Sequence, residues 1–167
     1  MKKLLAGSAM VLALAATANQ AQAQTAQIGA RATVQQALTI SATDSLLFGA
    51  VFPGTTRTVL ATDAASGSWT LAGAANAEVT LTFTLPANLV SGANNLPVTF
   101  GATAAGYNVL NSRAGQSTFN PTAVQTTRLH NASGNLYVFI GGSVSPVAQP
   151  AGSYTAAITL ATAYTGN

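Results

Sequence analysis

The chain has 167 residues, of which 49% are hydrophobic and 5% are charged, and it contains no cysteine. The formal net charge is +3, yet no basic stripe occurs, so we exclude a nucleic-acid-binding surface. A chain without cysteine has no disulfides, so core burial or a partner must stabilise the fold.

The first 23 residues predict a targeting segment. Residues 1–3 give a basic start, residues 4–18 form an apolar run, and Ala21-Gln22-Ala23 matches the pattern that signal peptidase reads. We expect cleavage after Ala23 and export of residues 24–167 as one domain, to the periplasm, the cell surface or the extracellular space. No second apolar run follows, so we expect no membrane span in the mature chain.

The mature chain is expected to begin with a β-strand. Apolar and polar residues alternate from Ile28 to Val34, and the same parity continues to Leu38 and Ile40. Such alternation is typical of a strand with one buried face.

Three runs of period two follow before residue 86. Residues 56–62 predict a short strand, and residues 67–73 place two large apolar residues on one face. Residues 77–85 give the clearest alternation, with apolar side chains on one face and mainly threonine on the other. This run predicts a half-buried antiparallel strand that ends at Pro86, because proline cannot donate to the ladder.

The second half of the chain has three more patterned runs. Residues 96–102 alternate, residues 135–144 are apolar on both faces as expected of a central strand, and residues 154–164 predict a closing strand. Residues 104–127 predict a long connection with at most one short strand. Turn-forming residues separate the runs, so we predict an all-β fold, an antiparallel sandwich of about 7–9 strands.

The polar residues form no recognisable catalytic or metal-binding constellation. His130 is the only histidine and lies in a predicted loop, and the three acidic residues are scattered. A metal site needs clustered ligands, and a glycosidase needs two converging carboxyl groups. We therefore expect Asp44 and Asp63 to be turn residues and Glu78 to lie on a polar strand face. We expect no enzymatic activity, no cofactor and no metal.

Two further features have structural interpretations. Gly141-Gly142 follows a strand without the lysine of a phosphate loop, so we expect a bulge or a close backbone approach there. Trp69 is expected to pack in the core rather than to form a sugar-stacking surface.

Four stretches stand out in order along the chain: SLLFGAVFPG at residues 45–54, LPANLVSG followed by LPVTF, LYVFIGGSVSP, and the closing QPAGSYTAAITLATAYTGN. The most specific parts are the L-x-F-G motif at residues 46–49, the Gly-Gly pair and the final strand. Together they resemble a family of secreted bacterial proteins, domain of unknown function 4402. The family has no assigned catalytic residues. It is similar in pattern to fimbrial subunits, which implies an immunoglobulin-like sandwich.

The similarity to fimbrial subunits implies assembly by strand complementation, in which the N-terminal strand of one subunit fills a groove in the next. The alternating N-terminal residues would provide such a strand, and the last strand would lie beside the groove. The candidate residues are Ile28, Ala30, Ala32, Val34, Ile158 and Leu160. Alanine at two of these N-terminal positions also fits a first strand that pairs within its own domain, so both pairings stay open.

The leading hypothesis is a non-enzymatic, exported structural or adhesive surface protein, such as a fimbrial or pilin-like subunit. Its partners would be copies of itself or related subunits, together with a periplasmic chaperone. An alternative is a monomeric secreted module that binds a glycan or polymer through its loops. A small outer-membrane β-barrel ranks last, because the chain ends in Thr165-Gly166-Asn167 without a terminal aromatic residue.

Overall fold

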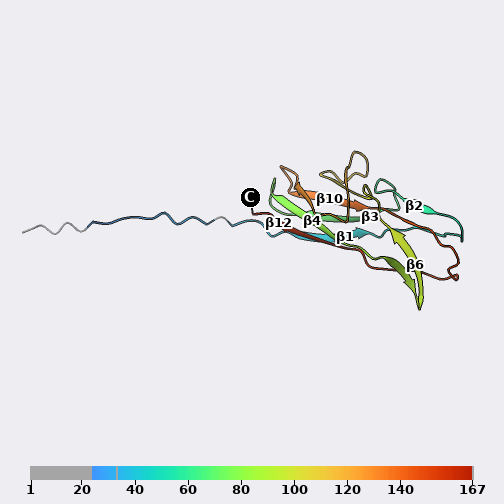
Figure 1. Ribbon diagram of the computed structural model, residues 1–167. Coiled ribbons are helices and arrows are strands. Elements are labelled where there is room, and N and C mark those ends of the chain that lie inside the picture. Colours follow the sequence, from blue (N-terminus) through green and yellow to red (C-terminus); the bar gives the residue numbers. More distant parts are fainter. Residues whose placement is uncertain (1–23, 33, 167) are drawn as a thin grey trace, which may run out of the picture. The chain divides into compact units, whose positions relative to one another are not determined.

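The computed structural model describes residues 24–32 and 34–166, which belong to two separate units: an N-terminal segment and a β domain that begins at Val34. The predicted targeting segment lies outside the described residues. The described chain contains twelve strands in three antiparallel sheets and no helix (Figure 1). The prediction of an all-β sandwich is confirmed. No helix of the described residues has the length and apolar character needed to cross a membrane.

The largest sheet has five strands. Its order is β1 (Thr39–Asp44), β3 (Gly67–Ala72), β10 (Asn135–Ile140), β7 (Ala105–Asn108) and β8 (Ser117–Phe119). β10 lies at the centre, as predicted from a run that is apolar on both faces. Leu136 and Val138 on one face and Phe139 on the other are at most 2% exposed.

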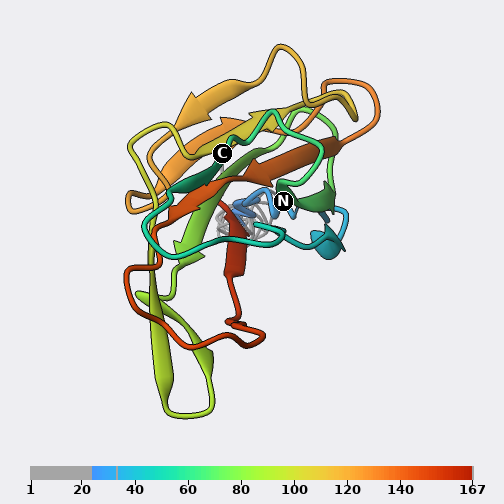
Figure 2. The ribbon, with the colours of Figure 1, turned by 90° about the vertical axis from the view of Figure 1, so that its right-hand side faces the viewer.

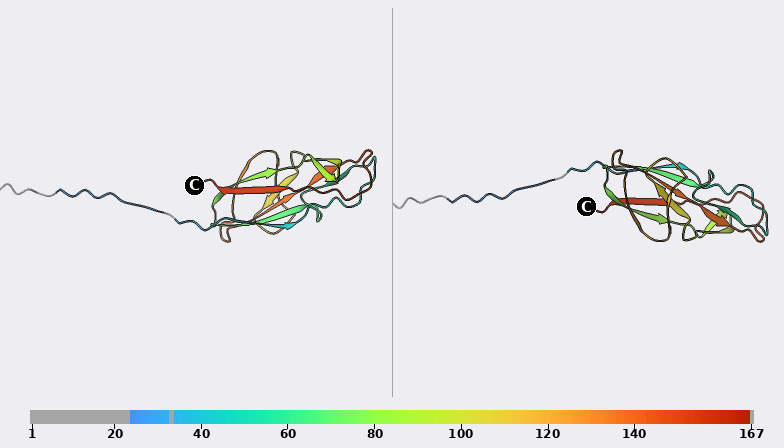
Figure 3. Two further views of the ribbon diagram at one scale, coloured as in Figure 1. Left: turned by 90° about the horizontal axis from the view of Figure 1, so that it is seen from below. Right: turned by 90° about the horizontal axis from the view of Figure 1, so that it is seen from above.

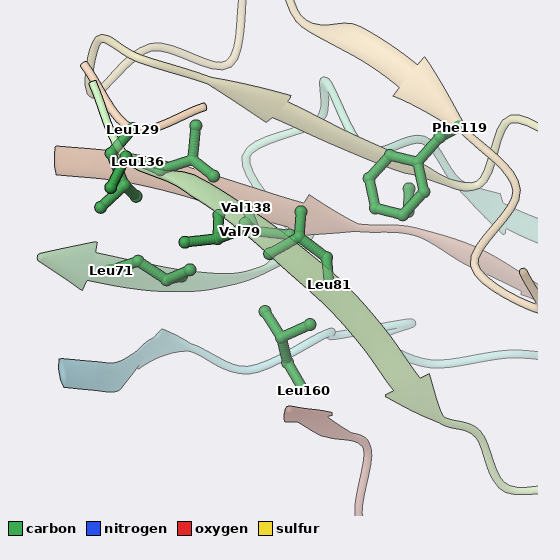
Figure 4. Close-up of a cluster of buried hydrophobic side chains, with 10 residues drawn as sticks. Leu71, Val79, Leu81, Phe119, Leu129, Leu136, Val138 and Leu160 are labelled. Carbon is green, nitrogen blue, oxygen red and sulfur yellow. The ribbon is translucent and has the colours of Figure 1, made fainter. Parts of the chain in front are cut away.

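A three-stranded sheet faces the first sheet across the main core. Its order is β12 (Thr159–Tyr164), β4 (Glu78–Thr84) and β9 (Gln125–Arg128). Val79 and Leu81 of β4 are completely buried, while Thr82 and Thr84 are exposed, which confirms the predicted half-buried strand. Figure 4 shows side chains from both sheets converging in this core. Its buried members are Leu71, Ala77, Val79, Leu81, Ala105, Phe119, Leu129, Leu136, Val138 and Leu160.

The third sheet has four strands and a much smaller core. Its order is β2 (Arg57–Val59), β11 (Gly142–Val144), β6 (Asn94–Thr99) and β5 (Asn88–Ser91). Only Leu96, Val98 and Val144 form the buried part of this second cluster. Several half-buried apolar side chains pack against them, among them Phe48 and Phe100. Since the cluster is largely rimmed by half-exposed apolar groups, this part of the domain has an incomplete core.

The chain passes from the five-stranded to the four-stranded sheet between β10 and β11, at Gly141. A Cβ atom added to Gly141 would collide with the carbonyl oxygen of Val59 and approach the backbone of Leu60 within 2.8 Å. The predicted close backbone approach is confirmed. Only glycine lets β2 pass this closely.

Gly141→Ala should therefore destabilise the domain, because the colliding atoms belong to the backbone and have no rotamer to change. We expect a loss of about 1–3 kcal/mol in the free energy of unfolding, measured by urea denaturation. Gly101→Ala is the matched control, since a Cβ there meets nothing within 4 Å. Equal stability of the two variants would contradict the steric explanation.

The structure differs from the sequence-based expectations in several segments. Residues 104–127 contain β7, β8 and the start of β9, so the prediction of at most one short strand is wrong. These strands have only three or four residues, too few to show alternation. The closing strand begins at Thr159 rather than at residue 154, and Thr155 makes only an isolated bridge to Val90.

The predicted first strand also starts later than expected. β1 begins at Thr39, and residues 24–32 and 34–38 are in no strand. Two of the four apolar positions in the predicted strand are alanine, which buries little surface to offset the entropy of ordering the chain. The side chains of Ile28 and Val34 are 94% and 96% exposed.

Candidate functional site: an apolar groove at one end of the domain

A groove of about 1080 Å³ opens at the end of the domain where β1 finishes and β12 begins. Residues 45–53 form one wall and residues 149–158 form the other. The floor comes from the five-stranded and four-stranded sheets. Its side chains are Trp69, Leu96, Val98, Phe100, Ile140 and Val144. Apart from the indole N–H of Trp69 these side chains are entirely apolar, so the groove suits an apolar ligand.

The first wall is the segment SLLFGAVFPG, which follows β1 directly. Its apolar residues Phe48 and Val51 pack against the second core cluster. Gly49 adopts φ = +70°, a conformation that favours glycine and that turns the wall between these two residues. Leu47 N–H donates to Ala65 O at 2.9 Å, but residues 48–51 make no backbone–backbone hydrogen bond to any described residue.

The second wall is the segment between β11 and β12, and it runs beside the β5–β6 hairpin (Figure 2). The Tyr154 hydroxyl donates to Pro150 O at 2.9 Å, which closes a turn within the wall. Thr155 exchanges two backbone hydrogen bonds with Val90 of β5. Ala156 and Ala157 make no backbone–backbone hydrogen bond within the described residues.

Both walls therefore present free backbone groups. In extended chain, the N–H and C=O groups of successive residues point to opposite sides. Leu47 donates its N–H to Ala65, and its neighbour Phe48 has no backbone–backbone partner among the described residues. Because Thr155 pairs with Val90, Ala156 points away from β5. Exposed backbone edges with unpaired N–H and C=O groups are templates for a further strand, so these edges are suited to an added strand.

Beyond the groove, the edge strands β1 and β12 lie opposite each other without pairing. β1 pairs only with β3, and β12 pairs only with β4, so each is the edge of its sheet. Figure 3 shows β12 lying between β4 and β1. Ile40 is paired with the fully buried Leu71, yet it is 38% exposed. The inner face of β1 is thus left partly uncovered along its length.

A charged cluster lies where β1 meets the first wall. Asp44 Oδ2 accepts hydrogen bonds from Ser68 Oγ at 2.7 Å and from Arg113 Nη2 at 2.8 Å. These two hydrogen bonds, that of Ser68 first, hold the pKa of Asp44 below its ordinary value of 3.8. The expectation that Asp44 is a turn residue is wrong, because it ends β1 and forms an ion pair.

The other polar residues singled out in the sequence have structural roles. Asp63 is a turn residue as predicted, since its carboxylate accepts the N–H of Leu60 at 2.9 Å. Glu78 of β4 pairs with Arg128 of β9 at 3.3 Å. His130 Nδ1 accepts the N–H of Ser133 at 3.1 Å within a loop. Within residues 24–32 and 34–166, no three His, Asp or Glu side chains gather as a metal site would require.

Trp69 belongs to both the core and the groove. Its ring packs edge-on against Phe83, with 5.5 Å between the ring centroids, and it lies against the main core cluster. The same side chain lines the groove. As the only tryptophan in the chain, it gives the groove an intrinsic fluorescence probe.

The structure separates the six candidate residues into three groups. Ile158 lines the groove and is half-buried, whereas Leu160 is 5% exposed and belongs to the main core. The four N-terminal residues are exposed, and those of residues 24–32 belong to a different unit from the groove. None of the six candidate residues belongs to the groove floor. The sequence gives no signal for the floor, because the floor residues look like ordinary core positions of several strands.

Comparison with known proteins gives no relative: no family model matches the chain, and no curated protein matches its sequence.

Proposed function

We propose that this protein is an exported, non-enzymatic structural or adhesive subunit of the fimbrial type, which assembles by strand complementation. In this proposal the groove of one copy receives the N-terminal segment, residues 24–35, of another. The sandwich, whose first and last strands are both sheet edges, supports the immunoglobulin-like fold that the family resemblance implies. Before assembly, a periplasmic chaperone would cover the same groove.

The observation that carries the proposal is the groove with an apolar floor and free backbone on both walls. An added strand would satisfy two needs at once. Its backbone would pair with the wall residues, and its apolar side chains would cover half-buried groups of the second cluster such as Phe48 and Phe100. A small-molecule pocket does not require open hydrogen-bonding edges of this kind.

The N-terminal segment has the matching pattern. Ile28, Ala30, Ala32 and Val34 would face the floor, and the residues between them would face solvent. Burial of the exposed Ile28 side chain contributes about 2 kcal/mol. The two alanines bring the inserted backbone close to the floor at the middle of the run.

The point at which the chain enters the domain favours insertion into a second copy. Tyr164 OH donates to the carbonyl oxygen of Gln36 at 2.9 Å and accepts the N–H of Ala74 at 2.7 Å. This holds Gln36 at the Thr39 end of β1, whereas the groove lies at the Asp44 end. Six residues of β1 span about 20 Å.

A segment that folded back into its own groove would have to cross that distance first. About six of its residues would be used along β1, so most of the alternating run would never reach the groove floor. A second copy has no such constraint. Insertion of this kind uses different surfaces of the two partners, which produces an open head-to-tail chain rather than a closed dimer.

The proposal is tested with and without the N-terminal segment. The chain of residues 24–167 should form polymers, and the chain of residues 36–167 should not. A synthetic peptide of residues 24–35 should raise the melting temperature of the shortened chain in proportion to the logarithm of its concentration and change the fluorescence of Trp69. The measurements are light scattering, thermal unfolding and fluorescence.

A peptide of the same composition with its apolar residues moved out of alternation is the control. The proposal is overturned if the chain of residues 24–167 stays monomeric while the shortened chain is unfolded with or without peptide.

A further inference from the structure

We infer that Arg113 is a positioning residue for strand insertion: its guanidinium joins Asp44 to the start of β3 and thereby holds the first wall of the groove in place. The inference rests on the proposed function. It assigns a role in assembly to a side chain that lies outside the groove and that does not contact the inserted strand.

Arg113 reaches three separate parts of the fold from the loop between β7 and β8. Nη2 donates to Asp44 Oδ2 at 2.8 Å, and Nε donates to the hydroxyl of Ser66 at 3.1 Å. The guanidinium carbon lies 5.3 Å from the ring centroid of Phe139 in β10. Ser66 is completely buried and Phe139 is 2% exposed, so the cation is fixed against rigid structure.

The first wall has few other attachments. It leaves the sheet at Asp44, next to a β-bulge in which the register of β1 against β3 shifts between Ala42 and Asp44. The next attachment is the hydrogen bond from Leu47 N–H to Ala65 O. Beyond it, residues 48–51 have no backbone–backbone partner among the described residues, and the far end of the wall is held by Gly54 N–H, which donates to Pro146 O at 2.8 Å.

The hydrogen bond from Leu47 and the hydrogen bond from Arg113 end on adjacent residues, Ala65 and Ser66. Arg113 adds a charged link between this stretch and Asp44, beside the hydrogen bond that Ser68 donates to the same carboxylate. A strand that pairs with the wall needs its N–H and C=O groups in register. Loss of the Arg113 contact would remove this charged link and loosen the Asp44 end of the wall, and each insertion would then have to order that end.

Neutralisation of Asp44 would have the same effect as loss of Arg113. Among the described residues, the groups that bind the Asp44 carboxylate are Arg113 and Ser68, and Arg113 is the only charged one. Because the pKa of Asp44 is lowered, the ion pair is complete at neutral pH and is lost only as the pH falls through that lowered pKa.

The experiment measures the concentration at which half of the chain of residues 24–167 is assembled. Arg113→Gln should raise this concentration about tenfold, because a charge-assisted, two-armed contact is lost. Arg113→Lys should assemble better than Arg113→Gln but less well than the wild type, since lysine keeps the charge but cannot bind Asp44 and Ser66 with a planar fork. Arg128→Gln is the matched control: it removes the ion pair with Glu78 between β4 and β9, and it should change the half-assembly concentration less than twofold.

Stability is measured separately, by thermal unfolding of the same variants in an Ile28→Asp background that does not assemble. We expect Arg113→Gln to lower the melting temperature more than Arg128→Gln there, because it takes the hydrogen-bond donor away from the buried Ser66 hydroxyl. Assembly is therefore compared at a temperature at which both variants are folded. In the wild type, the half-assembly concentration should stay constant between pH 7 and pH 5, and it should rise only when the pH falls through the lowered pKa of Asp44, below its ordinary value of 3.8.

The outcomes separate the two proposals. If the wild type does not assemble at any pH, the proposed function fails. If the wild type assembles and Arg113→Gln assembles equally well, only the positioning role is overturned. It is also overturned if Arg113→Gln weakens assembly merely in proportion to a lower melting temperature.

Discussion

Replacement of Ile28 by aspartate should abolish assembly and leave the β domain folded. Ile28 is the largest apolar residue of the N-terminal run and is 94% exposed, so the substitution removes no contact from the free subunit. In the proposed complex its side chain enters an apolar groove. The lost burial corresponds to about 2 kcal/mol, or roughly thirtyfold in affinity. An unpaired carboxylate in that environment increases the loss further, to at least about a hundredfold.

The measurement is light scattering as a function of protein concentration, with circular dichroism to verify the fold. Gln27→Asp is the matched control, because it adds the same charge at the adjacent position, whose side chain would face solvent. It should assemble nearly as well as the wild type. Equal effects at positions 27 and 28 would show that charge, and not parity, controls assembly, and strand insertion would then be abandoned.

The second large effect is expected in the main core. Leu81 lies in the middle of β4, is completely buried, and packs between the two sheets (Figure 4). Leu81→Ala removes several buried carbon atoms from a site that strands enclose on both sides. We expect a loss of about 3 kcal/mol in the free energy of unfolding, a large part of the typical stability of a domain this size.

Urea denaturation in the Ile28→Asp background measures this loss without interference from assembly. Thr82→Ala is the control, since Thr82 is the next residue of the same strand and points to solvent. Its effect should stay within about 1 kcal/mol. A comparable loss in both variants would mean that strand propensity rather than core packing determines the stability of β4.

The sequence predicts well those strands in which burial produces a regular pattern. β4 has one buried face, so its alternation is visible, and β10 lies at the centre of a sheet, so both of its faces are apolar. β7, β8 and β9 were missed because each has at most four residues and buries few large side chains. A pattern of period two needs more positions than these strands contain.

The groove could be predicted only in part, because its walls are not strands. Phe52-Pro53-Gly54 and Gln149-Pro150-Ala151-Gly152 look like ordinary turns, and turns are where the two walls bend. The floor combines side chains from four strands whose register is set by tertiary pairing. Ile158 lines the groove whereas Leu160 lies in the core, a distinction that depends on where β12 begins to pair with β4.

Because the chain passes directly from β10 to β11 through Gly141, the resistance of a subunit to proteolysis should depend on its neighbours in the assembly. β10 is the central strand of the main core, and β11, which follows after one residue, contributes Val144 to the groove floor. A strand seated on that floor would make local opening of β11 rarer, and the continuous backbone would extend the protection into the core. Proteases act on opened chains, so an assembled subunit should survive longer than a free one. In a chain without disulfides, assembly would then supply the lifetime that covalent cross-links give to many exported proteins.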